Sequence, residues 1–279
     1  MNVMLLGGAG FVGRHLATAL RERGDAVTIA SLRDPHAAAR SAASCDAIVN
    51  LAGEQIGQRW NAALKRRIEE SRVDLPRRFL ELLAQHSRRA GAYVSASAVG
   101  YYGPSETATF DEESPPGDDF LARVCVAWEG EARRAADLGM RVAIVRTGIA
   151  LGADGGALHK ILPPFRAGAG GRIGSGRQWF SWIHVDDLAG IYLMALDGVE
   201  GVVNACAPHP VTNAQFTTEL ASALHRPSAL PVPAFALRAL LGEGADLLLK
   251  GQRVLPHRTE RLGYRFRFPE LKAALANLL

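Results

Sequence analysis

The amino-acid sequence predicts a doubly wound α/β fold, with helices on both faces of a mostly parallel sheet and a smaller C-terminal lobe. Two observations lead to this class. Short continuous apolar runs of strand length alternate with longer stretches whose apolar residues recur at helical spacing, a pattern typical of parallel strands covered by helices. The chain has 279 residues, of which 48% are hydrophobic and 22% charged, which suits one large core with an appendage.

Six apolar runs are the predicted strands, and they are residues 3–6, 26–30, 47–51, 92–95, 142–146 and 202–205. Helical spacing follows the first run at Phe11, Leu16 and Leu20. Only about a dozen residues separate Arg33 from Cys45, which is too few for a helix, a third strand and a return crossover. We therefore expect the third strand of a standard doubly wound sheet to be short or absent.

The second half of the chain is richer in glycine and proline. Pro163-Pro164 and a glycine-rich run over residues 168–176 predict a long loop over residues 152–181, and long loops in compact domains are usually functional. Prolines in the last quarter of the chain separate short helices. The expected domains are therefore a large one over residues 1–205, into which the loop is inserted, and a small substrate lobe over residues 206–279.

Charge and cysteine content exclude several classes of protein. Lysine and arginine outnumber aspartate and glutamate by only 32 to 28, without a basic block, so nucleic-acid binding is not expected. The three cysteines are widely spaced and form no C-x-x-C pair, which argues against a disulfide framework and a thiolate zinc site. No apolar stretch is long enough to cross a bilayer and the N-terminus lacks a basic leader, so we expect a cytoplasmic protein that does not bind membranes.

The strongest local motif is G-G-A-G-F-V-G over residues 7–13, where the first strand ends and a helix begins. Gly7 permits the tight turn, Gly10 lets the backbone approach a pyrophosphate, and Gly13 allows close packing of helix on strand. In this position the motif predicts a dinucleotide-binding site.

The end of the second predicted strand indicates the type of dinucleotide. An acidic residue there would bind the ribose 2′-hydroxyl of NAD, but the sequence has Ser31 and Arg33, with no acid before Asp34. A hydroxyl and a guanidinium suit a 2′-phosphate better, so NADP(H) is favoured over NAD(H). The alternative is that Arg33 is a solvated loop charge.

Two further motifs follow the next two strands. Residues 50–53 read N-L-A-G, and Leu51, Ala52 and Gly53 are placed to line the adenine and ribose side of a dinucleotide. Residues 95–103 read S-A-S-A-V-G-Y-Y-G and put hydroxyl groups at the carboxyl edge of the sheet, where ligands of open α/β sheets bind. Each motif alone is compatible with turn chemistry, but their order indicates one site.

This order of motifs resembles the extended short-chain dehydrogenase/reductase superfamily. The chain resembles most its atypical branch of epimerase family, or nucleoside-diphosphate-sugar-epimerase-like, proteins, and does so from end to end. The resemblance is carried by N-L-A-G-E at residues 50–54, Arg59-Trp60, Ser71-Arg72, S-A-S-A-V-G-Y-Y-G at 95–103, G-S-G-R-Q-W-F-S-W-I-H-V-D-D at 174–187, A-P-H-P-V-T-N at 207–213 and G-Q-R-V-L-P at 251–256.

What the resemblance implies is a Rossmann-type domain that binds NADP(H) and a small C-terminal lobe over the substrate. The implied cofactor contacts are Gly7, Gly10, Phe11, Val12, Gly13, Ser31 with its neighbours, Leu51, Ala52, Arg72 and Ala150. In the same comparison Ser97 matches the serine or threonine that hydrogen-bonds a substrate hydroxyl or carbonyl.

The sequence departs from the superfamily at its acid/base pair. Redox members carry Y-x-x-x-K, in which the lysine makes tyrosine a usable proton carrier, but none of the four lysines here has a tyrosine four residues before it. Val124 and Trp128 stand near the two positions. Tyr101 and Tyr102 are the nearest candidates to replace the tyrosine, and aromatic packing is the alternative for both. The candidates for the missing cation are Arg72 and Arg146.

The glycine-rich loop is the predicted substrate site. We expect Arg177, Gln178 and Trp182 to bind the substrate, because loop arginines can clamp a diphosphate or carboxylate through bidentate hydrogen bonds. The resemblance implies a small anionic or nucleotide-linked substrate; solvated arginines are the alternative. His184 and Asp186 have the H-x-D spacing of iron oxygenases. No metal is expected, because the resemblance implies that I-H-V-D-D-L starts a helix, with Asp186 or Asp187 as its cap and His184 at a strand end.

Two functions of different class follow. The first is an NADP(H)-dependent oxidoreductase or epimerase-like enzyme, in which Ser97 positions the reacting oxygen and an acid such as Tyr101 moves the proton. The second is a non-catalytic NADP(H)-binding sensor or regulatory protein, because Y-x-x-x-K is absent. A homodimer is one expected assembly.

Overall fold

The structure is a computed structural model that describes residues 1–86, 90–228 and 230–279. Its centre is a six-stranded parallel sheet with the strand order β10-β6-β4-β3-β1-β2. The strands are β1 (Asn2–Leu6), β2 (Ala26–Ala30), β3 (Ala47–Asn50), β4 (Ala92–Ala98), β6 (Arg141–Thr147) and β10 (Gly201–Ala205). Every apolar run that the sequence analysis assigned to the sheet is therefore a strand of it.

Among the described residues, the third strand of a standard doubly wound sheet is absent, which is one of the two expected outcomes. After β2 the chain forms α2 (Pro35–Ala42) and returns to β3, which pairs with β1 and not with β2. No third strand lies beyond β2 in the described part of the chain. The order of strands therefore reverses between β1 and β3, and the carboxyl ends on either side of such a reversal form the usual ligand crevice of this architecture.

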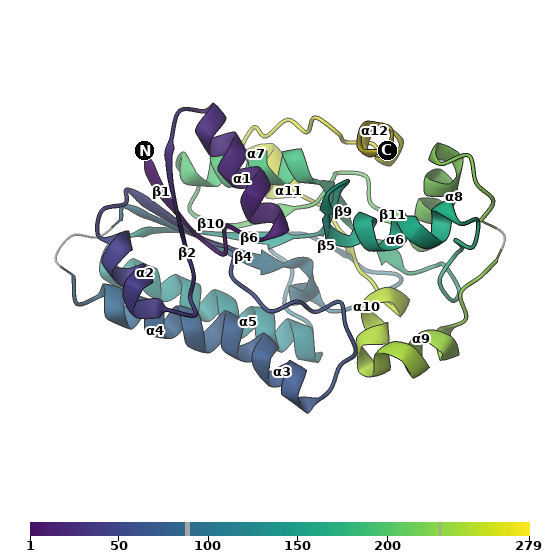
Figure 1. The fold of residues 1–279 in the computed structure, drawn as a ribbon, viewed down its shortest axis with the longest axis horizontal. Helices are drawn as coiled ribbons and strands as arrows, with labels where there is room; N and C mark the ends of the chain where they lie inside the picture. The colour runs from purple at the N-terminus through teal and green to yellow at the C-terminus, as the bar shows by residue number, and fades with distance from the viewer. Residues whose placement is uncertain (87–89, 229) are drawn as a thin grey trace.

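Helices cover both faces of the sheet (Figure 1). On one face, α1 (Phe11–Glu22) and α7 (Val185–Leu196) bury Leu16, Leu20 and Ile191 against the strands. The other face is covered by α2, α4 (Leu75–Leu83) and α5 (Phe120–Arg133), which bury Phe79 and Leu83. Burial on both faces explains why the strands read as continuous apolar runs.

The helix α3 (Ala62–Glu69) runs into α4 through one wide turn, η1 (Glu70–Asp74), which has π-helical hydrogen bonding. Such π-turns occur frequently at functional sites, because the extra residue reorients the side chains around it. Here the turn carries Arg72.

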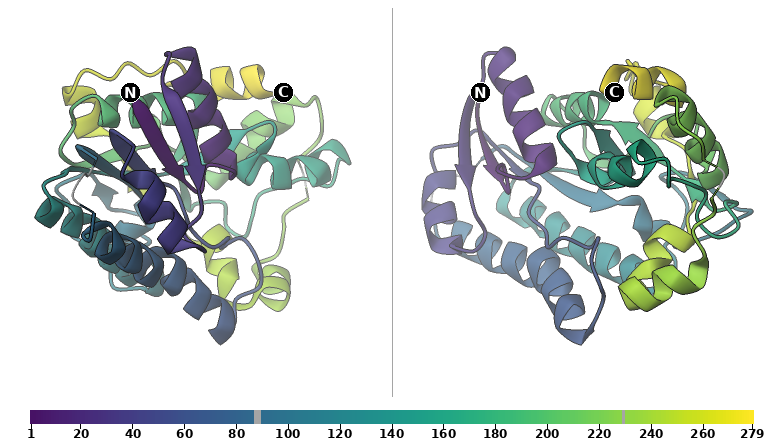
Figure 2. Two further views of the ribbon diagram at one scale, coloured as in Figure 1. Left: turned by 60° about the vertical axis from the view of Figure 1, so that its left-hand side comes forward. Right: turned by 45° about the vertical axis from the view of Figure 1, so that its right-hand side comes forward.

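The smaller lobe lies at one end of the sheet, where Figure 2 shows the green and yellow-green helices gathered away from the N-terminal strands. It contains α6 (Gly156–Arg166), α8 (Asn213–Ala223), α9 (Ala234–Leu241), η4 (Gly242–Ala245), α10 (Asp246–Leu249), α11 (His257–Arg261) and α12 (Leu271–Leu278). Three short strand pairs complete it: β7 (Ile149–Gly152) with β9 (Trp182–His184), β8 (Trp179–Phe180) with β11 (Val211–Thr212), and β5 (Thr109–Phe110) with β12 (Arg253–Val254).

The expectation of one long loop over residues 152–181 is wrong for its first part. Residues 156–166 form α6, with Pro163 and Pro164 inside the helix. Leu158, Leu162 and Phe165 of α6 join a separate core with α8 and α12, so packing in the lobe overrides the helix-breaking tendency of the prolines. In the described part of the chain, no helix has both the length and the apolar character needed to traverse a bilayer.

Candidate functional site

The glycine-rich turn after β1 leaves no room for side chains. Gly7 has a φ of +81°, and a Cβ atom on it would lie 3.0 Å from the backbone of Leu51 and Ala52. A Cβ atom on Gly13 would lie 2.6 Å from the Cα atom of Gly8. Both contacts are with backbone, which cannot move aside cheaply, so the glycines let α1 and the turn after β3 close tightly around the end of β1.

The helix α1 begins directly after this turn and presents its N-terminal amides. Gly10 is the N-cap residue and no side chain caps the helix, which leaves the dipole and amides of the first turn available to an anion. The Phe11 ring packs against the turn between β7 and α6, because Cβ atoms on Gly152 and Gly155 would each lie 2.5 Å from it. Val12 packs against the main core. Both side chains thus fix the helix start, and their backbone lies at the predicted cofactor site.

At the end of β2 the acidic residue is already engaged. The Asp34 side chain accepts a hydrogen bond of 2.9 Å from the amide of Ala37 and caps α2. Ser31 and Arg33 are exposed, and the Arg33 guanidinium forms no ion pair in the described part of the chain. Because Asp34 acts as a cap, the polar groups that this edge offers to a ribose are a hydroxyl and a guanidinium.

The turn after β3 meets the π-turn that carries Arg72. The Arg72 guanidinium lies so close to Gly53 that a Cβ atom there would be 3.0 Å from it, and it donates a 3.1 Å hydrogen bond to the carbonyl of Glu54. Burial lowers the pKa of Arg72 below its ordinary value. On its other side, Arg72 lies 5.1 Å from the ring of Trp128 on α5. Gly53, Arg72 and Trp128 therefore form one stacked group at the switch point.

A cavity of about 550 Å³ opens at the carboxyl ends of β4 and β6, between the sheet and the smaller lobe. Ala98, Gly148 and Ala150 line it from the sheet side, and Lys250 and Gln252 from the lobe. Its size and its position at the carboxyl edge match those of ligand sites in open α/β folds. Of the residues predicted from sequence, Ala150 alone lines this cavity.

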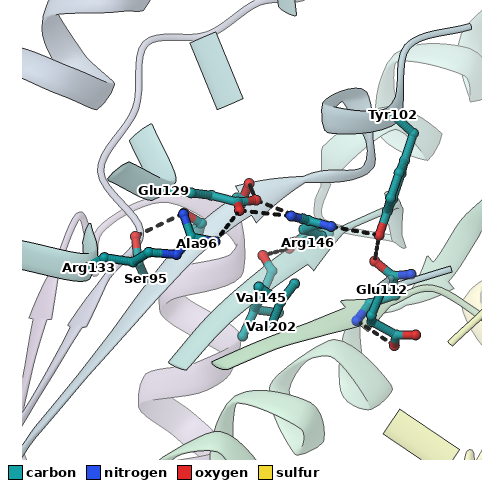
Figure 3. A network of polar contacts seen from close by, with 12 residues as sticks. Ser95, Ala96, Tyr102, Glu112, Glu129, Arg133, Val145, Arg146 and Val202 are labelled. Carbon is teal, nitrogen blue, oxygen red and sulfur yellow. Dashed lines mark hydrogen bonds and ion pairs between the residues drawn. The ribbon is translucent and has the colours of Figure 1, made fainter. Parts of the chain in front are cut away.

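Ser97 does not line the cavity; its hydroxyl joins a buried polar network. Figure 3 shows Glu129, Arg146 and Tyr102 of this network. Its hydroxyl donates a 2.8 Å hydrogen bond to Glu129 of α5, and Glu129 forms a two-pronged ion pair with Arg146 of β6, with N···O distances of 2.7 and 2.9 Å. Glu129 is 1% exposed and Arg146 2% exposed. Burial disfavours the charged guanidinium, but the hydrogen bonds and charge of Glu129, together with Tyr102, outweigh burial and raise the pKa of Arg146.

Tyr101 and Tyr102 both contact the same guanidinium. Arg146 lies 3.4 Å from the centre of the Tyr101 ring and donates a 3.0 Å hydrogen bond to the Tyr102 hydroxyl. The Tyr102 hydroxyl in turn donates a 2.7 Å hydrogen bond to Asn204, and burial raises its pKa above the ordinary value of 10.0. The expected cation is thus beside both tyrosines, but the Tyr102 hydroxyl is fully engaged inside the protein, which is the geometry of a structural group and not of a proton donor to the cavity.

The three residues expected to bind substrate do not line the cavity. Arg177 is exposed and pairs with Glu106 at 3.3 Å. The Gln178 amide donates hydrogen bonds of 3.1 and 2.8 Å to the carbonyls of Ile173 and Leu248 and joins two parts of the lobe. Trp182 is 0% exposed and belongs to the core of the lobe, so its assignment to the substrate site is wrong.

Several residues that line the cavity were not among the candidate site residues predicted from the sequence. Trp60 precedes α3, and Asp246 and Lys250 belong to the short lobe helix α10 and its end, so no local motif connects them. Trp179 lies in the loop predicted as the substrate site. The resemblance also pointed toward these positions, through Arg59-Trp60, the motif at residues 174–187 and G-Q-R-V-L-P after Lys250.

His184 and Cys125 have structural roles. The helix α7 is capped by His184 and not, as expected, by Asp186 or Asp187. The His184 Nδ1 accepts a 3.1 Å hydrogen bond from the Asp186 amide, while its Nε2 contacts Asn277 at 3.0 Å. No group of three potential metal ligands occurs among the described residues. Cys125 is 4% exposed, and burial raises the pKa of its thiol to about 12, so it is a core residue and not a nucleophile.

Comparison with known proteins gives matches along the whole chain. Residues 3–206 match the NAD dependent epimerase/dehydratase family, and residues 232–278 match a domain of unknown function. Two relatives are 43% identical: an epimerase family protein SDR39U1 homolog, named chloroplastic, from Arabidopsis thaliana, and epimerase family protein SDR39U1 from Bos taurus. Both matches cover 100% of this chain, with 87% of the plant protein and 100% of the bovine protein.

A solved structure of human epimerase family protein SDR39U1, isoform 2, contains NADPH and superposes with a TM-score of 0.93 at 41% sequence identity. The match covers 100% of this chain and 99% of the human chain. The doubly wound fold predicted from the sequence is therefore confirmed, including its smaller lobe.

Proposed function

Because the chain belongs to the NAD dependent epimerase/dehydratase family, we propose that it is an NADP(H)-dependent oxidoreductase or epimerase-like enzyme. Hydride passes between the nicotinamide and a hydroxyl or carbonyl carbon of a small substrate in the cavity of about 550 Å³. The observation that carries the proposal is the side-chain-free turn at Gly7 and Gly13 below the uncapped start of α1. A dinucleotide diphosphate is the ligand that this arrangement suits.

The chain's own residues fit NADP(H). The turn over residues 7–13 receives the diphosphate, Ser31 and Arg33 bind the 2′-phosphate, and Arg72 lies beside the turn after β3. NADPH in the crystal structure of the human relative supports the choice of NADP(H) over NAD(H). When bound, the cofactor supplies or accepts the hydride; the protein provides binding, orientation and a path for the proton.

Trp128 offers a further contact to the cofactor. Its indole nitrogen is buried and finds no hydrogen-bond partner among the described residues, although buried polar groups are nearly always paired. In the resembling superfamily the lysine at this position grips the nicotinamide ribose, so a ribose hydroxyl is the partner that we assign to the indole N–H.

The proton must come from a group that reaches the cavity. Among the charged side chains of the described residues that line it, Lys250 is the one with N–H donors, and we assign it the role of acid toward the substrate oxygen. Ser97 and Tyr101 do not line the cavity; the first bonds Glu129 and the second packs on Arg146. Their catalytic roles remain predictions from the sequence.

The test is the reduction of a broad panel of aldehydes and ketones by the purified protein with NADPH, and the oxidation of NADPH is measured by its absorbance. A Lys250→Met variant is expected to lose at least about tenfold in kcat with unchanged NADPH affinity, and Lys250→Arg should not restore the rate, because arginine does not release its proton. A protein that binds NADPH tightly but oxidises it with no member of the panel would contradict the enzymatic proposal.

A second function is favoured by one observation. Val124 and Trp128, which the resemblance puts near the positions of the acid/base pair, are both buried, as expected for a non-catalytic NADP(H)-binding sensor or regulatory protein. In that case Lys250→Met, which leaves the dinucleotide site intact, would leave the cellular role unchanged.

A cytoplasmic location and a homodimer remain predictions of the sequence analysis, and the plant relative is named chloroplastic.

A further inference from the structure

We propose that the cavity selects an uncharged, largely apolar, ring-containing carbonyl compound and discriminates against nucleoside-diphosphate sugars and other polyanions. This deepens the proposed function and rests on it, since it names the substrate class of the same site. It replaces the anionic, nucleotide-linked substrate that the sequence predicted. Three features of the cavity lead to it: the aromatic walls, the state of their polar groups, and the pairing of every charge.

The walls of the cavity are mostly apolar. Three aromatic side chains line it, Trp60, Phe120 and Trp179, together with aliphatic groups such as Leu121 and Leu247. Trp60 and Phe120 are in edge-to-face contact, with ring centres 5.5 Å apart and planes at 75°. Aromatic rings in such positions offer large rigid surfaces for other rings, which gain stacking energy beyond the burial of area.

Both indole N–H groups in these walls are already used. Trp60 donates a 2.8 Å hydrogen bond to the carbonyl of Ile56, and Trp179 donates a 2.9 Å hydrogen bond to the carbonyl of Glu106. The two tryptophans are therefore fixed by backbone and present ring surface, not donors, to a ligand. The Trp60 amide also bonds the carbonyl of Leu241 at 3.1 Å, which fixes this wall to α9.

Every charged side chain that lines the cavity has a protein partner. Lys250 pairs with Asp246 at 2.8 Å, and Glu243 pairs with Lys65 outside the lining. The carboxylate of Asp119 accepts a 2.8 Å hydrogen bond from the amide of Ala122 and caps α5. Lys65 and Lys250 thus neutralise Glu243 and Asp246, and the carboxylate of Asp119 has no cationic partner among the described residues. A diphosphate would therefore enter a site that, in the described part of the chain, has no unpaired cation and a small excess of negative charge.

No arginine lines the cavity among the described residues. Diphosphates are recognised in proteins chiefly through bidentate guanidinium groups and lysines, and the loop arginine expected in that role, Arg177, pairs with Glu106 and is exposed. A neutral carbonyl compound needs only one donor for its oxygen. Lys250 can provide it without giving up Asp246, because an ammonium group has three N–H donors.

The experiment compares binding of two probes to the protein saturated with NADP⁺: tetralone, a neutral bicyclic ketone, and UDP-glucose. Binding is measured by calorimetry and by quenching of tryptophan fluorescence, so the result does not depend on turnover. We expect tetralone to bind at least about tenfold more tightly than UDP-glucose, a difference of about 1.4 kcal/mol. Equal or tighter binding of UDP-glucose, or no binding of tetralone, would overturn the proposal.

A matched pair of variants tests whether the cavity wall sets this preference. Leu247 lines the cavity, whereas the neighbouring Leu248 is 37% exposed and does not. Leu247→Arg should weaken tetralone binding by at least about tenfold and strengthen UDP-glucose binding, because it removes apolar surface and adds a guanidinium. Leu248→Arg adds the same charge outside the cavity and should change neither constant by more than about twofold.

The outcomes separate this inference from the proposed function. Tetralone that binds selectively but is not reduced with NADPH would leave the substrate class standing and contradict the enzymatic proposal. UDP-glucose that binds preferentially and is oxidised or epimerised would support the enzyme and refute the substrate class.

Discussion

The NADP(H) preference depends on Arg33, and its removal should change one dinucleotide constant and not the other. Arg33 is exposed at the end of β2 and has no ion pair in the described part of the chain, while the adjacent Asp34 is occupied as the cap of α2. A hydrogen bond to a charged group contributes about 1.5–3 kcal/mol. Arg33→Ala should therefore raise the Kd of NADPH by about 10- to 150-fold and leave that of NADH within about twofold.

The measurement is calorimetric titration of both dinucleotides into the wild type and the variant, at low and at high salt. The matched control is Arg40→Ala, which removes the same charge from the last turn of α2, and it should alter neither constant. High salt should reduce the NADPH preference of the wild type but not of Arg33→Ala, since exposed charges are screened. Equal weakening of NADPH and NADH, or an unchanged NADPH constant, would refute the assignment of the 2′-phosphate to Arg33.

Three further changes have calculable consequences. Gly13→Ala places a Cβ atom 2.6 Å from backbone and, as an overpacking change, should lower the free energy of unfolding in urea by about 1–3 kcal/mol. It should also weaken NADPH binding by more than about tenfold, and binding within about twofold of wild type would contradict the assignment of the diphosphate to the turn over residues 7–13. Glu129→Ala strands a buried guanidinium and should cost about 3–5 kcal/mol, whereas Arg133→Ala, whose side chain is 54% exposed, should cost less than about 1 kcal/mol; equal losses would refute this ranking. Burial lowers the pKa of His184 below its ordinary 6.5. The contribution of neutral His184 to the free energy of unfolding is therefore full above pH 6.5 and is lost as the pH falls from there through the folded-state pKa. His184→Asn should flatten that part of the profile of stability against pH.

The sheet could be predicted from the sequence because its strands are buried on both faces and therefore leave continuous apolar runs. The short or absent third strand was predicted from the small number of residues between Arg33 and Cys45. The turn over residues 7–13 could also be predicted from the sequence. Gly13 is required by contact with the backbone of Gly8 in the same turn, and Gly7 by contact with the backbone that follows β3, the neighbour of β1 in the sheet.

The cavity could not be predicted in the same way, because its walls are assembled by the packing of the lobe onto the sheet. Trp182 and Trp179 differ by three positions on one segment, yet one is in a core and the other lines the cavity. Likewise, Glu129 gives no sign in the sequence that it faces Arg146, since the pair exists only where α5 crosses β6. Trp179 belongs to β8, which pairs with β11, and Trp182 to β9, which pairs with β7. The pairing of short strands and the register of helix on sheet decide the two cases, and composition fixes neither.

The place of the missing tyrosine connects the fold to the proposed substrate class. Val124, which stands near that position, is 3% exposed and packs with Leu64 and Ile68 in a cluster that also includes Trp60 and Phe120. Trp60 and Phe120 line the cavity, so the position that carries an acid in redox members of the superfamily here supports an apolar wall. A tyrosine hydroxyl there would have to be desolvated among these rings. The proton donor must then approach from the opposite side, and Lys250, at the end of α10, lines the cavity from the lobe.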